Sequence, residues 1–74
     1  MDEAYVVEGL FVLINTWGED SHLRRPTPDE RVLLDAFFAS PRSRNNDGTI
    51  QFMYGDELPG IDGDVLIYVA DPLV

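Results

Sequence analysis

The sequence predicts a small α+β domain, and three segments carry that prediction. Residues 28–39 have the start signal and the apolar content of a helix, whereas residues 49–54 and 65–70 have the composition of strands. The expected order is β-α-β-β, in which the last two strands form an antiparallel hairpin that packs on the helix. An α-α-β-β order is the alternative, because the first segment, residues 4–17, is compatible with a strand or a helix.

The helix prediction depends on signals at both ends of the segment. Thr27 is a favourable N-cap, Pro28 suits the first helical position, and Glu30 completes a capping box with Thr27. At the other end, Ser40 and Pro41 end the helix, because a residue that precedes proline avoids the α region. Apolar residues lie nearly all round this segment, which indicates a second buried contact besides the sheet.

The two later strands are predicted from different patterns. Residues 49–54 alternate between a face of large apolar side chains and a mixed face, which is typical of a half-buried strand. Residues 65–70 are apolar throughout and therefore predict a better-buried strand. The nine residues between them, 55–63, form an acidic loop rich in turn-forming residues, and loops of this length are often functional.

Residues 4–17 favour a strand by composition, since they are rich in valine, isoleucine and aromatic residues. An interior Gly9 and several β-branched residues would also cost a helix stability. In a strand, Gly9 would mark a β-bulge. The helix remains the alternative, because a set of polar and small residues shares one side of a helical wheel: Glu8, Gly9, Asn15 and Thr16.

Charge is distributed unevenly along the chain. Its 74 residues include 14 acidic residues against five arginines and no lysine, which gives a net charge of −9. Residues 1–23 carry −5, residues 24–44 hold every arginine and carry +2, and residues 45–74 carry −6. Such a field repels nucleic acid and anionic membranes, which need Lys and Arg for contact. It favours fast, salt-sensitive association with a basic protein surface.

Length and composition exclude several further classes. The chain is shorter than a typical domain of about 100–150 residues, so residues 1–74 are expected to form a single domain. The absence of cysteine excludes disulfides and thiolate zinc sites. An acidic start is unlike a secretory signal, and the longest apolar run, residues 10–14, is far shorter than a membrane span. A cytoplasmic protein is the resulting expectation.

The chain has few residues of the types that most often act as catalytic nucleophiles. Without cysteine or lysine, nucleophile chemistry would depend on serine, threonine and the single His22, which follows Ser21. Neighbours in sequence do not make a catalytic triad, so His22 is expected to be an exposed loop residue. The glycines fit neither the phosphate-binding loop nor the dinucleotide-binding pattern. We therefore predict no enzyme activity, no catalytic residue and no cofactor.

One segment partly resembles a calcium-binding loop. Residues 43–54 look like an EF-hand loop in the middle, where Asn45 and Asp47 occupy ligand positions. The ends differ, because Ser43 and Tyr54 stand where an EF-hand requires carboxylates. The turn Asn46-Asp47-Gly48 explains the match without a metal, so we predict none.

The candidate contact residues are acidic or aromatic. Acidic side chains would meet the basic partner, Trp17 would serve as an apolar anchor, and the two phenylalanines of helix 28–39 would hold a second copy of the chain. The predicted contact residues are Asp56, Glu57, Asp62, Asp64, Glu19, Asp20, Trp17, Phe37 and Phe38.

These features predict a non-enzymatic protein–protein interaction module that binds a partner with a basic surface. The alternative is an anti-defence inhibitor of the type that bacterial viruses carry, which this chain resembles in size and charge. Such a nucleic-acid mimic would place its carboxylates in a basic groove of a DNA- or RNA-binding protein.

Overall fold

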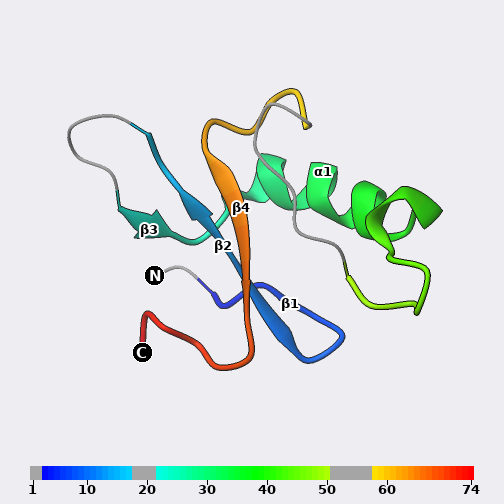
Figure 1. Ribbon diagram of the computed structural model, residues 1–74. Coiled ribbons are helices and arrows are strands. Elements are labelled where there is room, and N and C mark those ends of the chain that lie inside the picture. The colour runs from blue at the N-terminus through cyan, green and yellow to red at the C-terminus, as the bar shows by residue number, and fades with distance from the viewer. Residues whose placement is uncertain (1–2, 18–21, 51–57) are drawn as a thin grey trace.

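The computed structural model describes residues 3–17, 22–50 and 58–74. These residues form one antiparallel sheet of four strands with one α-helix packed against it, which confirms the predicted α+β class (Figure 1). In chain order the elements are β1 (Val6–Val7), β2 (Leu10–Asn15), β3 (Leu23–Arg24), α1 (Pro28–Phe38), the 3₁₀ turn η1 (Pro41–Ser43) and β4 (Asp64–Tyr68).

Strand β2 is the centre of the sheet, because every other described strand pairs with it. β4 pairs with residues 11–15 of β2, whereas β1 pairs with residues 10–11 and β3 with residues 14–15. All three pairings are antiparallel. A strand has only two edges, so β1 and β3 lie end to end along the edge opposite β4.

The first segment is a strand, as its composition favours, and it forms a hairpin. Val7 pairs with Leu10, which leaves Glu8 and Gly9 as a two-residue turn. Both turn residues have positive φ, 53° at Glu8 and 81° at Gly9, which is the pattern of a type I′ turn. The predicted β-bulge at Gly9 is therefore wrong, because this glycine reverses the chain instead of kinking one strand.

Helix α1 begins as the sequence predicts. The hydroxyl of Thr27 accepts a hydrogen bond from the Glu30 N–H at 3.2 Å, and the Glu30 carboxylate accepts one from the Thr27 N–H at 2.8 Å. The helix ends at Phe38 with Ala39 as its C-cap, close to the predicted end at residue 39. Ser40 then caps the following 3₁₀ turn.

The hydrophobic core lies between α1 and one face of the sheet. Leu34 and Phe38 follow Glu30 at intervals of four residues, so the three buried positions of α1 share one side of the helix. Ile14 and Val65 face them from paired positions of β2 and β4. The buried residues of this cluster are Tyr5, Val12, Ile14, Leu34, Phe38, Ile61 and Val65. We call the opposite side of the sheet the outer face.

The second half of the chain differs in detail from the sequence prediction. β4 spans residues 64–68 instead of 65–70, and its described partner is β2. Val69, which the prediction placed in the strand, is 85% exposed. Most of the predicted strand 49–54 lies outside the described residues, and Ile50 forms an isolated bridge with Arg44. The short strand β3 was not predicted.

Candidate interaction surface

Four of the nine predicted contact residues, Asp56, Glu57, Glu19 and Asp20, lie outside the described residues. The other five divide into two groups. Trp17, Asp62 and Asp64 lie near the ends of β2 and β4, whereas Phe37 and Phe38 lie near the end of α1. Trp17 is 53% exposed and Asp62 is exposed, whereas Asp64 and Phe37 are partly buried and Phe38 is buried.

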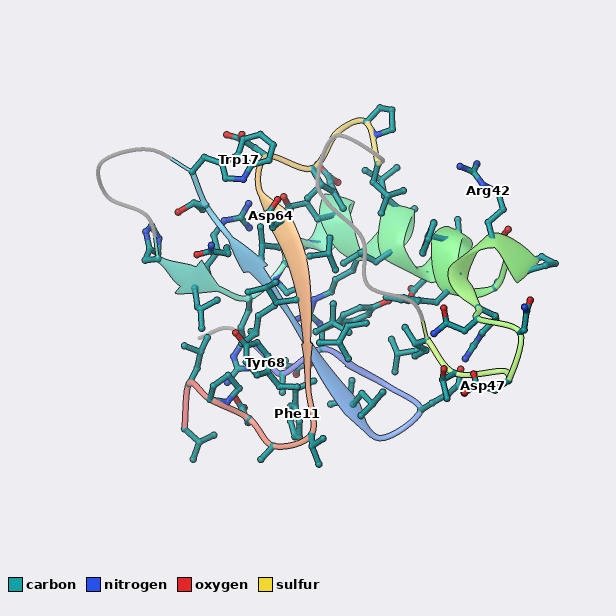
Figure 2. The ribbon with its side chains drawn as sticks, in the orientation of Figure 1. Phe11, Trp17, Arg42, Asp47, Asp64 and Tyr68 are labelled. Atoms are coloured by element: carbon teal, nitrogen blue, oxygen red, sulfur yellow. The ribbon has the colours of Figure 1, made fainter. Side chains whose placement is uncertain are left out.

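Trp17 and Asp64 lie at the same end of the sheet (Figure 2). Asp64 pairs with Asn15, and Trp17 follows Asn15 by two residues. The extended pairing continues past β2, because the Thr16 N–H donates to the carbonyl of His22 at 3.0 Å. Residues two apart in an extended chain point to the same side, so the indole and the Asp64 carboxylate share the outer face.

The phenylalanines of α1 point toward the core. Phe38 is 5% exposed, and its ring meets that of Phe37 edge to face, with 5.6 Å between the ring centroids. Phe37 is partly buried and packs against the core cluster. The exposed apolar side chain of α1 is Val32, at 68%. The helix therefore leaves Phe37 partly exposed and Phe38 buried.

Two consecutive arginines, Arg24 and Arg25, form ion pairs with carboxylates from different parts of the chain. Arg24 donates from its two terminal guanidinium nitrogens, Nη1 and Nη2, to the two carboxylate oxygens of Glu30, at 2.6 and 2.9 Å. This hydrogen bonding, together with the negative charges of Glu30 and Asp62, raises the pKa of Arg24 against the opposing effect of desolvation. Arg25 donates to Asp71 at 2.7 Å, and that hydrogen bond lowers the pKa of Asp71. In both pairs, a carboxylate of the same molecule neutralises the arginine charge.

Two further arginines tie the N-terminal segment to the middle of the chain. Arg44 pairs with Glu8 in the hairpin turn. Arg31 donates to the backbone carbonyl of Glu3, and its guanidinium lies 5.7 Å from the centroid of the Tyr5 ring, a cation–π arrangement. Among the described residues, only Arg42 has a guanidinium that is exposed and without a partner. Most arginines of residues 24–44 therefore bind groups within the molecule. The electrostatic field around the molecule is then dominated by its acidic residues.

The Glu30 carboxylate gives stability a defined pH dependence. The hydrogen bonds from Arg24 hold its pKa below the ordinary 4.5, despite the opposing effect of burial. A lowered folded pKa means that this stabilisation is present above about pH 4.5 and disappears as the pH falls through the folded pKa. The pair therefore contributes to stability at neutral pH and not in strong acid.

Glu30→Gln tests this pair, because glutamine keeps the capping geometry and removes the charge. We expect the free energy of unfolding at pH 7 to fall by about 1–3 kcal/mol. The difference from the wild type should shrink below about pH 4 in urea unfolding followed by circular dichroism. Asp29→Asn, in the same helical turn but exposed, is the control and should change stability little. A pH-independent difference for Glu30→Gln would contradict the assignment.

Of the segment that resembles a calcium-binding loop, the structure describes residues 43–50, and these contain a hydrogen-bonded turn. Asp47 accepts hydrogen bonds from the Thr49 hydroxyl at 2.6 Å and from the Thr49 N–H at 3.0 Å, which lower its pKa. The Asn45 side-chain amide donates to the same Thr49 hydroxyl at 3.0 Å. These internal bonds explain the Asn-Asn-Asp-Gly pattern without a ligand.

The single histidine of the chain lies at the surface of the described structure. His22 is exposed, and its Nδ1 lies 3.2 Å from the Thr16 hydroxyl. Within residues 3–17, 22–50 and 58–74 there is no pocket and no group of three or more His, Asp or Glu residues placed to hold a metal ion. No helix in these ranges has the length and apolarity needed to cross a membrane.

Two of the three ion pairs join residues that are distant in sequence, so no local pattern predicts them. Asp71 lies 46 residues from Arg25, and Glu8 lies 36 residues from Arg44. The acidic segments on both sides of residues 24–44 indicate that the arginines have acidic partners, but they do not identify the partner of each arginine. Comparison of this chain with protein-family models, curated proteins and solved structures yields no match.

Proposed function

We propose that this chain is a non-enzymatic interaction module that binds a basic surface of a partner protein. The observation that carries the proposal is the half-exposed Trp17 beside Asp64 on the outer face of the sheet. Tryptophan is enriched among residues that dominate binding energy, and a neighbouring carboxylate matches lysine or arginine at the rim of an interface. Exposed Asp62 adds negative charge near this end of β4.

Most arginines of the chain pair with groups of the same molecule, and this supports a basic partner over an acidic one. Three arginines neutralise Glu30, Asp71 and Glu8, and Arg31 is occupied by backbone oxygens and Tyr5. A partner approaching the Trp17 end therefore meets carboxylates without competing guanidinium groups from those positions. Long-range attraction would speed its association at low salt.

The nucleic-acid mimic is a second candidate, because the same outward acidic field would suit a groove that normally binds DNA or RNA. Under this alternative, the partner is a nucleic-acid-binding protein, and its contacts with this chain and with nucleic acid exclude each other. Competition therefore separates the two candidates, since a general basic partner has no reason to release the chain when nucleic acid is added.

The test is quantitative binding of the partner to the wild-type chain and to single variants, after capture from cells that express the chain. Trp17→Ala should cost about 2 kcal/mol or more, which weakens binding roughly thirtyfold. Asp64→Asn should slow association and reduce its salt dependence. Val32→Ala, on exposed helix surface, is the control and should leave binding unchanged.

The outcomes are distinct. Loss of binding in Trp17→Ala with no effect of added DNA or RNA supports the interaction module. The same loss together with displacement by nucleic acid supports the mimic. A partner that binds both Trp17→Ala and Asp64→Asn as tightly as the wild type, at low and high salt alike, would exclude this surface as the contact.

A further inference from the structure

Arg25 and Asp71 form an ion pair that is mostly buried and joins two distant parts of the chain. The Nη2 atom of Arg25 donates to Oδ2 of Asp71 at 2.7 Å, and the two side chains are 13% and 9% exposed. Arg25 follows β3 directly, whereas Asp71 lies three residues after β4. The pair therefore ties residues 69–74, which we call the 69–74 segment, to the middle of the chain (Figure 1).

Asp71 is the residue that positions the 69–74 segment. The other residues of the segment are exposed, and Val69 is 85% exposed. Within the described residues, the hydrogen bonds of the segment end on the Asp71 carboxylate: one comes from Arg25, and one comes from the Leu73 N–H at 2.9 Å. A single carboxylate therefore holds the segment to the rest of the molecule and also closes the turn within it.

The hydrogen bonding of this buried pair is incomplete. Nη1 of Arg25 is buried and has no hydrogen-bond partner among the described residues. A buried donor without a partner costs free energy, and withdrawing two charges from water offsets much of their mutual attraction. The exposed residues of the 69–74 segment add little buried apolar surface. The closed contact is therefore only slightly more stable than an open one, in which water binds every donor of the guanidinium.

We propose that the 69–74 segment opens and closes as a unit while the sheet and α1 stay folded, and that the Arg25–Asp71 pair is the contact that closes it. Segments with few buried contacts open at a much smaller cost in free energy than the global unfolding of a domain. Opening converts Arg25 from a buried and neutralised group into a cation that other molecules can reach. The proposal involves neither Trp17 nor Asp64, so it is independent of the proposed function.

Modification of the full chain with the arginine reagent phenylglyoxal, located residue by residue by mass spectrometry, tests the proposal. The reagent condenses with both terminal nitrogens of a guanidinium, and in the closed form Nη1 is buried and Nη2 is bound to Asp71. Arg25 should react about tenfold to a hundredfold more slowly than in the urea-unfolded chain. Hydrogen exchange of the Val12 N–H, which donates to the Tyr5 carbonyl, should be slowed about a thousandfold or more by folding.

Asp71→Asn removes the charge and keeps an oxygen that accepts from the Leu73 N–H. It should speed the modification of Arg25 about fivefold or more, whereas exposed Arg42 should react as it does in the wild type. Asp29→Asn, the same substitution at an exposed position of α1, is the control and should leave the modification of Arg25 unchanged. Circular dichroism shows whether each variant is folded.

Three results would overturn the proposal, and two of them need only the wild type. Equal slowing of Arg25 modification and of Val12 exchange would mean that Arg25 becomes accessible through global unfolding alone. An Arg25 that reacts as fast in the folded chain as in the unfolded chain would mean that the segment is not closed. An unchanged rate at Arg25 in folded Asp71→Asn would show that the ion pair does not close the segment.

Discussion

Replacing Leu34 with alanine is expected to lower the free energy of unfolding by about 2–5 kcal/mol. Leu34 is fully buried in the core cluster, where α1 meets the sheet residues Val12, Ile14 and Val65. The truncation removes apolar contact and leaves a cavity that a well-packed core refills only in part. A domain of this size has a total stability of about 4–11 kcal/mol, so the loss is large.

Val32→Ala is the matched control for Leu34→Ala, since Val32 lies two residues earlier on the same helix and is 68% exposed. It should change stability by no more than about 0.5 kcal/mol. Urea unfolding followed by circular dichroism measures both changes. Equal effects of the two substitutions would show that Leu34 does not lie at the helix–sheet contact.

Gly63→Ala is expected to destabilise the fold by about 3 kcal/mol or more. Gly63 has φ of 135°, where a residue with a side chain is strained. A Cβ atom here would lie 2.5 Å from the backbone oxygen of Asn15 and 2.9 Å from Cγ2 of Ile14. Backbone cannot yield as a flexible side chain does, so the start of β4 would have to move away from β2.

Gly48→Ala separates strain from crowding. Gly48 also has positive φ, at 87°, but a Cβ atom there would have no neighbour within 4 Å. The substitution should cost only about 1–2 kcal/mol, from backbone conformation alone. Thermal unfolding of the two variants measures the difference. A cost at Gly63 no greater than that at Gly48 would refute the close approach of β4 to β2.

The local parts of the fold could be predicted from the sequence, and the non-local parts could not. The capping box of Thr27 and Glu30 involves residues three apart, so its pattern in the sequence is sufficient. The Glu8–Gly9 turn lacks the usual Asn-Gly or Asp-Gly pair, which explains why Gly9 was interpreted as a bulge. The pairing of β4 with β2 joins residues more than 45 apart, which no local pattern encodes.

The candidate site was predictable only in part. Residue type alone makes Trp17 and Asp64 candidate contacts, whereas their common position depends on the register of Asn15 with Asp64, which only the structure provides. The apolar residues nearly all round α1 predict an interface at Phe37 and Phe38. The helix instead turns its phenylalanines toward the core and exposes Val32, which shows that apolar content alone does not identify the solvent side.

The central position of β2 has a consequence for aggregation. Its sequence, Leu-Phe-Val-Leu-Ile-Asn, has high β propensity, no charge and no glycine or proline, the pattern of segments that stack into cross-β fibrils. In the native sheet β4 occupies one edge of this strand, and β1 and β3 share the other. Losing β4 would open an apolar edge that recruits other chains. Variants that detach β4 should therefore form fibrils before they populate a soluble unfolded state.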